Sequence, residues 1–165
     1  MLDYEKFLLK LKKIKILITD VDGVWTPGTL GYIEGGEEIK YFHVHDGYGL
    51  KMLIENGIEV VVVSTRYSDA VQKRCRELGI QSVFQGIQNK EEILNKLLEK
   101  YTQEEIGVIG DDILDLPLFA KAGVKFTVAN AVQAVKEKAD YITAASGGAG
   151  ALREIAELIL STRKD

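Results

Sequence analysis

The sequence lacks most of the features that stabilise secreted or membrane proteins. Cys75 is the only cysteine among 165 residues, so an internal disulfide is impossible, and this suits a reducing cytoplasm. No apolar run approaches the roughly 20 residues that span a bilayer. Segment 1–13 alternates charged and apolar residues at helical spacing, unlike a secretory signal, and predicts a short amphipathic helix. We therefore expect a cytoplasmic protein with no membrane partner.

Long basic blocks are also absent, and the formal net charge is -4. Nucleic acid is therefore not an expected partner. An anionic substrate remains compatible with this charge balance, because the charges beside a site decide which ligand it takes.

The composition and pattern that are present favour one globular domain over residues 1–165. Hydrophobic residues make up 46% of the chain, enough to bury a proper core. Predicted strands lie at 14–19, 59–63, 82–84, 106–109, 124–128 and 141–142, and predicted helices at 69–78, 90–101, 116–121, 132–138 and 152–160. This alternation is typical of an α/β fold, a three-layer Rossmann-like parallel sheet with helices on both faces.

Segment 29–44 interrupts the alternation. Two strand-like pieces, 29–33 and 38–44, flank a Gly-Gly pair and predict a β-hairpin that forms a small cap. It is inserted before a helix that begins near Gly47, so it should rise from the sheet edge beside Asp20. Its apolar side chains exceed what a two-stranded ribbon can hide; they are Tyr32, Ile39, Tyr41 and Phe42. We expect it to pack against the same hairpin of other subunits, and the alternative is packing over its own domain.

An acidic motif, Asp20-Val21-Asp22-Gly23, directly follows the first predicted strand. Alternation along the strand would place Asp20 and Asp22 on one side, with Gly23 opening a turn. Two crowded carboxylates at the carboxyl end of a buried strand repel each other and lose solvation. A divalent cation is the simplest compensation, and ligands bind at this edge of α/β sheets. The alternative is that Asp-Gly merely makes a turn.

A second acidic cluster, Gly110-Asp111-Asp112 with Asp115, follows another predicted strand. Asp111 would reach a metal held by Asp20, while Asp112 and Asp115 would bond the loop and neighbouring cations. The alternative is a polar turn in which Asp115 caps the helix at 116.

Two further segments supply positive charge and hydrogen-bond donors. Lys90 stands at a predicted helix start, where the macrodipole disfavours a cation by about 0.3–1 kcal/mol. That position makes sense if its ammonium balances the carboxylates and a phosphate, and the alternative is a solvated surface lysine. Ser64-Thr65-Arg66 follows the strand at 59–63 and predicts an anion site, with helix capping as the alternative.

In chain order, Asp20-x-Asp22, Ser64, Lys90 and Gly110-Asp111-Asp112 resemble the four motifs of the haloacid dehalogenase superfamily. Other segments between Lys15 and Leu160 are similar to the 3-deoxy-D-manno-octulosonate 8-phosphate phosphatase family. They are Phe42-x-Val44-x-Asp46-Gly47-Tyr48-Gly49, Arg74-Cys75, Leu78-Gly79-Ile80, Gln85-Gly86 and Gly147-Gly148-x-Gly150-Ala151-x-Arg153-Glu154.

The resemblance implies a magnesium-dependent phosphatase of lipopolysaccharide biosynthesis. Asp20 would be the nucleophile that forms an aspartyl-phosphate, and Asp22 would protonate the leaving sugar oxygen and then activate water. Mg²⁺ would be held by Asp20, the Asp22 carbonyl and Asp111. The phosphoryl group would be bound by Ser64, Thr65 and Lys90.

The resemblance also implies a homotetramer that binds the sugar acid between subunits. Its substrate contacts would be His43, Val44, His45, Asp46, Gly47, Lys51, Arg66 and Arg74. A Gly-rich tail and C-terminal helix at 146–165 would close over a neighbour's site and bring Arg153. Several residues depart from the family's usual pattern and bear on sugar specificity: Trp25, Pro27, His45, Lys51 and Thr65.

Four alternatives stay open on the sequence alone. A non-enzymatic receiver domain also accepts phosphate on an aspartate, although its acidic pair and its acceptor lie on different strands. A phosphatase for a nine-carbon sugar acid and a catalytically silent assembly subunit are the second and third. The fourth is a transition-metal site at His43, His45 and Asp46, whose histidines would share a face of a strand. Cys75, which has no paired base, is interpreted as a packing residue.

Overall fold

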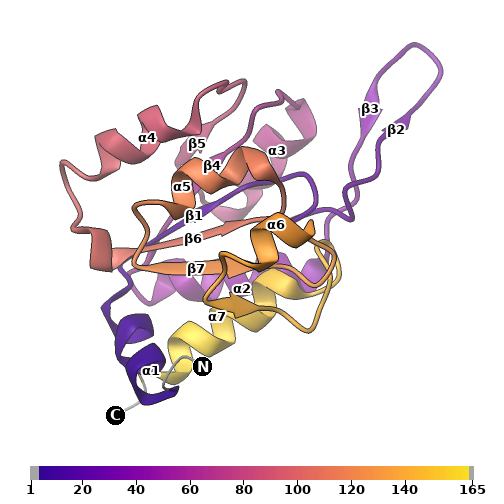
Figure 1. Ribbon diagram of the computed structural model, residues 1–165. Coiled ribbons are helices and arrows are strands. Elements are labelled where there is room, and N and C mark those ends of the chain that lie inside the picture. The colour runs from indigo at the N-terminus through magenta and orange to yellow at the C-terminus, as the bar shows by residue number, and fades with distance from the viewer. Residues whose placement is uncertain (1–3, 164–165) are drawn as a thin grey trace.

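The computed structural model describes residues 4–163, which form a sheet between two layers of helices (Figure 1). The main sheet has the order β5-β4-β1-β6-β7-β8, and its pairings are all parallel. Its strands are β1 (Ile16–Thr19), β4 (Glu59–Val63), β5 (Ser82–Phe84), β6 (Ile106–Gly110), β7 (Val124–Thr127) and β8 (Tyr141–Ile142). The predicted α/β fold with helices on both faces is therefore confirmed.

The helices divide between the two faces of the sheet. They are α1 (Tyr4–Lys13), α2 (Val44–Glu55), α3 (Asp69–Leu78), α4 (Lys90–Leu97), α5 (Leu116–Phe119), α6 (Gln133–Lys136) and α7 (Ala151–Ser161). Residues of α1, α2, α3 and α7 share one core with Leu17, while residues of α4, α5 and α6 share the other with Ile16 and Ile18. Figure 1 shows α4 and α5 on one side of the sheet and α2 and α7 on the other. Successive side chains of β1 thus alternate between two buried cores, which explains its unbroken aliphatic run.

Helices α2 and α7 pack along each other at close range. A Cβ on Gly49 of α2 would lie 2.9 Å from the Cα of Arg153 of α7, so only glycine allows this approach. Leu152, Ile155 and Ile159 of α7 are fully buried. The C-terminal helix is therefore part of the core of its own domain.

The strand register brings the polar motifs to one edge of the sheet. Thr19 at the end of β1 pairs with Val62 of β4 and with Ile109 of β6. The chain runs from β1 to β4 and β5 on one side and places β6, β7 and β8 on the other. Such a reversal creates the crevice where ligands bind in open α/β sheets.

The inserted hairpin is present but shorter than predicted. Its strands are β2 (Gly31–Tyr32) and β3 (Glu38–Ile39), which pair antiparallel and project away from the sheet (Figure 1). Gly35 and Gly36 make the turn with positive φ angles of 101° and 87°, which favour glycine. The prediction of a strand over 38–44 and a helix from Gly47 was wrong, because α2 already begins at Val44.

Most predicted element ends lie within a few residues of the observed ones. The strand at 59–63, the helix at 69–78 and the strand at 82–84 match at both ends. The helix predicted over 90–101 ends early, at Leu97. Helix α1 lies in the predicted N-terminal segment, and residues 1–3 of that segment are outside the described part. Within residues 4–163, the helices are all too short and polar to cross a membrane.

Candidate active site

A cavity of about 260 Å³ opens at the carboxyl edge beside β1. Five of the residues that line it are acids: Asp20, Asp22, Asp111, Asp112 and Asp115. The predicted donors and cations that line it with them are Ser64, Thr65, Arg66 and Lys90. Three strand ends and the start of α4 thus bring together the residues of the four sequence motifs.

Asp20 follows β1 directly and continues its ladder, since its amide donates to the Ile109 carbonyl at 3.1 Å. The residue is 8% exposed. Burial, and then repulsion from Asp115, raise the pKa of Asp20 to about 7, although Lys90 opposes both. A carboxylate that loses so much solvation is poised to accept a cation.

Lys90 reaches into this cluster from the first turn of α4, where Asn89 caps the helix and accepts from the Glu91 amide. Its Nζ lies 2.5 Å from Asp20 and 2.6 Å from Asp115, and its side chain is 3% exposed. Burial alone would lower the pKa of Lys90, but the two carboxylates outweigh it and raise the pKa. The ammonium therefore stays charged, and the alternative of a solvated surface lysine was wrong.

Asp115 fixes the loop that follows β6. Its Oδ2 accepts from the amides of Asp111 at 2.9 Å and Asp112 at 3.2 Å, while its Oδ1 faces Lys90. The helical turn Ile113–Asp115 is capped instead by Asp112, which accepts from the Ile113 amide at 2.7 Å. Asp115 does stand at the N-cap position of α5, but its side chain makes no cap hydrogen bond there because the carboxylate turns inward to Lys90 and the loop amides.

Asp111 completes a group of acids with the composition of a metal site. Ligand oxygens of Asp20, Asp111 and Asp115 lie within 4.8 Å of one another. Burial, and then repulsion from Asp20 and its other acidic neighbours, raise the pKa of Asp111 to about 8. One ammonium faces three buried or half-buried carboxyls, so a second cation fits, and hard oxygen donors suit Mg²⁺. Asp111 also explains why residue 23 is a glycine, since a Cβ at that position would overlap the Asp111 carboxyl.

Ser64 and Thr65 lie across the cavity, after β4. Ser64 is 4% exposed, and its hydroxyl accepts from the Arg66 amide at 3.2 Å. Its amide and carbonyl bond Phe84 and Ile87, which hold this turn against β5 and the segment that follows. The side chain has one local partner and still lines the cavity, as expected for a group that can also donate to an anion.

Two residues that sequence reasoning missed, Lys40 and Glu38, belong to the hairpin. Lys40 forms ion pairs with Asp22 and, at 2.8 Å, with Glu38. Arg66 forms an ion pair with Glu38 and lies 3.8 Å from Asp22. Partial burial raises the pKa of Glu38, but Lys40 and Arg66 outweigh it and hold the pKa below its ordinary value. The available signal was a lysine inside the predicted hairpin strand at 38–44, which was expected to rise beside the acidic loop.

Most of the residues predicted to contact the substrate lie away from this cavity. Of that set, Arg66 lines it. Asp46 is 3% exposed and accepts from the amides of Gly150 and Arg153, so it caps α7 in its own chain. Arg74 lies where a Cβ on Gly47 would be. The Arg153 side chain bonds Glu157 and lies over the Tyr48 ring, 5.3 Å from its centroid.

The two histidines do not alternate on a strand, contrary to the premise of the transition-metal alternative. His43 is the N-cap of α2 and accepts from the His45 amide at 3.2 Å, and His45 lies in the first turn. Their rings meet edge to face at 4.9 Å. Val44 and Lys51 are exposed on the same helix.

Comparison with known proteins places this chain in a family. A sequence profile described as haloacid dehalogenase-like hydrolase matches residues 82–155. A Haemophilus influenzae protein named 3-deoxy-D-manno-octulosonate 8-phosphate phosphatase KdsC is 45% identical over 156 residues, which cover 93% of this chain and 87% of the relative. The Escherichia coli K12 protein of that name is 39% identical over 155 residues, which cover 93% and 82%. The chain belongs to this phosphatase family of the haloacid dehalogenase superfamily.

Solved structures of the family share the whole fold. The Moraxella catarrhalis phosphatase, described in complex with magnesium ion, phosphate ion and KDO, has a TM-score of 0.92 at 38% identity; the match covers 96% of this chain and 92% of that one. The Yersinia pestis phosphatase has a TM-score of 0.92 at 37% identity, covering 94% and 85%. The four sequence motifs and the acid-lined cavity thus lie on a fold that the whole family shares.

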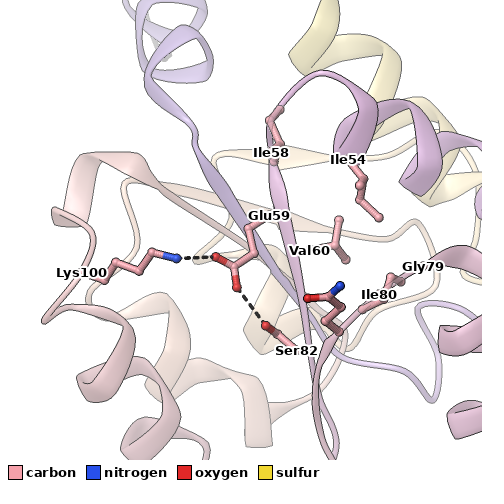
Figure 2. A pocket seen from close by; sticks show the side chains of 9 residues that line it. Ile54, Ile58, Glu59, Val60, Gly79, Ile80, Ser82 and Lys100 are labelled. Atoms are coloured by element: carbon pink, nitrogen blue, oxygen red, sulfur yellow. Dashed lines mark hydrogen bonds and ion pairs between the residues drawn. The ribbon is translucent and has the colours of Figure 1, made fainter.

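A second cavity, of about 400 Å³, lies at the amino edge of the sheet, opposite the acid cluster (Figure 2). Glu59 on its wall accepts from Tyr101 at 2.6 Å, from Ser82 at 2.8 Å and from Lys100 at 3.1 Å. These bonds satisfy the only carboxylate among the lining residues that the structure describes, and Ile58, Val60 and Ile80 are nearly buried. The residues of the four sequence motifs line the smaller, acidic cavity and not this one.

Cys75 lies on α3 inside the core and is fully buried. Burial raises the pKa of its thiol to about 11, so the thiolate is scarce at neutral pH. Cys75 is therefore a packing residue of the core.

Proposed function

We propose that this protein is a magnesium-dependent phosphatase that hydrolyses 3-deoxy-D-manno-octulosonate 8-phosphate to the free sugar acid and phosphate. The observation that carries the proposal is the Asp20–Lys90–Asp111 cluster at the switch point of a family fold. A buried carboxylate with an ammonium and further acids beside it can attack an electrophile such as a phosphoryl group, once bound cations neutralise the negative charge of both.

In the first half-reaction, an Asp20 oxygen attacks phosphorus and the sugar oxygen leaves with a proton from Asp22. In the second, Asp22 takes a proton from water, which attacks the aspartyl-phosphate and releases phosphate. Lys90, Ser64 and Thr65 hold the oxygens of the transferring group. Asp20, the Asp22 carbonyl and Asp111 would hold Mg²⁺, which when bound neutralises charge between the carboxylate and the phosphate.

The sugar acid is assigned to the face between α2, α3 and the mouth of the cavity. Arg66 lines the cavity, and Arg74 lies against Gly47 on neighbouring helices. Cations there suit a sugar carboxylate, and His43, Val44, His45, Asp46 and Lys51 are further predicted contacts. A phosphatase for a nine-carbon sugar acid is the second candidate, because His45 and Lys51 stand where the family commonly has arginine.

We also propose a homotetramer assembled through the hairpin, acting in the cytoplasm. Leu30, Tyr32, Ile33 and Tyr41 are 53%, 60%, 45% and 73% exposed, an apolar surface that a projecting ribbon cannot cover by itself. In such an assembly Arg153 would reach a neighbour's site, which stays a prediction.

A panel of phosphorylated sugar acids, assayed with and without Mg²⁺, tests the function. The eight-carbon substrate should be turned over with the highest kcat/KM, and chelation of the metal should abolish turnover. Preference for the nine-carbon ester would favour the second candidate. A long-lived aspartyl-phosphate without turnover would instead support the receiver-domain alternative.

A further inference from the structure

Four charged side chains form a closed ring at the base of the hairpin. Asp22 and Glu38 are both ion-paired with Lys40, and Arg66 joins the two acids from the other side. Asp22 comes from the loop after β1, Arg66 from the loop after β4, and Glu38 and Lys40 from the hairpin. The ring thus connects the inserted hairpin to Asp22, the proposed general acid.

Lys40 is placed to act on Asp22 rather than on a ligand. Its side chain is 3% exposed and does not line the acidic cavity, whereas Asp22 and Arg66 do. A buried ammonium is costly unless paired, and Asp22 and Glu38 supply its two partners. Lys40 therefore faces Asp22 and Glu38 and not the space where a phosphate ester would bind.

The backbone on both sides of Lys40 is held in place at the base of the hairpin. Glu38, two residues earlier, is in the paired strand β3, and Phe42, two residues later, packs edge to face on buried Trp25 at 6.2 Å. The Asp22 side chain, in contrast, is 24% exposed and lies on a loop. A carboxyl on a loop needs such a support if it is to meet a leaving oxygen in one orientation.

We propose that Lys40 is a positioning residue that holds the Asp22 carboxyl in the orientation from which it protonates the leaving oxygen. The proposal rests on the proposed function only in assigning the general-acid role to Asp22. It makes the hairpin a part of the catalytic apparatus within a single chain, in addition to its proposed role in assembly.

The test compares two leaving groups on the full-length protein with Mg²⁺. An alkyl ester, the sugar-acid phosphate, needs a proton on its leaving oxygen, whereas p-nitrophenyl phosphate expels a stable phenolate without one. The quantity measured is kcat/KM, which covers the steps up to departure of the leaving group and excludes hydrolysis of the aspartyl-phosphate.

Lys40→Met should lower kcat/KM for the alkyl ester by about 10²-fold and that for p-nitrophenyl phosphate by less than about 3-fold, because only the first reaction uses the acid. Asp22→Asn is the reference and should show the same selectivity. Lys73→Met, which removes an exposed lysine on α3, should change neither value. An equal loss on both substrates, or no loss on either, would overturn the positioning role.

A second variant distinguishes a loss of positioning from a folding defect. Lys40→Met/Glu38→Gln removes one charge of each sign, so the ring keeps its Asp22–Arg66 pair and its neutrality. It should fold, as judged by circular dichroism and melting, and show the same selective loss. A double variant with normal alkyl-ester activity would contradict the proposal.

If the substrate assignment is wrong, the same experiment gives a different result. If the wild type hydrolyses simple alkyl phosphates but no sugar-acid phosphate, the substrate assignment fails, and the leaving-group comparison is made on those alkyl esters. A wild type without activity on either ester class would overturn both proposals.

Discussion

The Nζ atom of Lys90 lies 2.5 Å from the Asp20 carboxylate, although 70 residues separate the two in the chain. Both side chains are nearly buried, and Asp115 approaches the same ammonium at 2.6 Å. One lysine therefore holds together the acid that follows β1 and the acid that fixes the loop after β6. The same charges therefore support the fold and hold Asp20, the proposed nucleophile, in place.

Replacing Lys90 with methionine should lower the free energy of unfolding by about 3 kcal/mol near neutral pH, since it leaves carboxylates buried without their cation. Urea titration in the absence of divalent metal measures the change. Lys96→Met, on an exposed position of α4, is the matched control and should shift stability by less than about 0.5 kcal/mol. Equal effects of the two substitutions would contradict the role of the buried pair.

Asp20→Asn should reduce phosphate release by at least about 10³-fold while the protein stays folded, because the amide keeps the shape and lacks the nucleophile. Phosphate release with Mg²⁺ measures the loss, and circular dichroism checks the fold. Turnover close to that of the wild type would remove Asp20 from the mechanism.

Metal binding should depend on pH through Asp20 and Asp111. Their pKa values are raised to about 7 and about 8, so between about pH 4 and pH 8 the metal-free folded state holds protons that the unfolded state has lost. Their contribution to metal-free stability therefore falls as the pH rises through this window. Mg²⁺ binds the deprotonated carboxylates, so its stabilising effect should grow over the same range.

Thermal melting in EDTA and in excess Mg²⁺ measures this effect. The rise in Tm on adding Mg²⁺ should be larger at about pH 8.5 than at about pH 6. Asp111→Asn serves as the matched variant, and its metal-dependent rise should be small at both values. The same rise at both pH values in the wild type would show that these carboxyls do not titrate with the metal.

The hairpin should be required for assembly. Replacing residues 31–39 with a short turn would remove two of its four exposed apolar side chains, Tyr32 and Ile33, together with the paired strands that present the other two. Light scattering should then give monomers or aggregates in place of a tetramer. A variant that keeps the native assembly would show that another surface holds the subunits together.

The sequence predicted the sheet and the acid cluster well because both depend on local pattern and on strand register. The strand at 59–63 and the helix at 69–78, which ends at Gly79, matched at both ends. Once parallel strands were inferred, the acids after β1 and β6 had to meet at one edge.

The parts that were missed depend on contacts between distant residues. Helix α4 ends at Leu97, and Lys100 and Tyr101 beyond it bond Glu59 at the start of β4, far along the chain. His43 was placed on a strand, but its ring caps α2. The pairing of Lys40 with Asp22 depends on how the base of the hairpin packs against the loop after β1. The spacing of apolar and polar residues in the sequence does not predict that packing.

Gly147 offers a last prediction, because it packs directly on the loop that carries Asp22. A Cβ on Gly147 would overlap the carbonyl of Gly23 and approach that of Thr26. The amide of Gly147 donates to Asn130 at 2.8 Å, and that of Gly148 donates to the Val24 carbonyl at 3.0 Å. The segment before α7 thus supports the β1 loop from behind.

Gly147→Ala should therefore push this loop toward the cavity, costing about 1–3 kcal/mol of stability and also lowering kcat/KM. Gly31→Ala is the control, since its Cβ would lie 3.7 Å from the nearest atom in ordinary contact. Urea unfolding and phosphate release on both variants measure the two effects. Loss of activity in Gly147→Ala without loss of stability would mean that the loop adapts and only the Asp22 geometry is disturbed, whereas unchanged values for both would show that the loop does not depend on this contact.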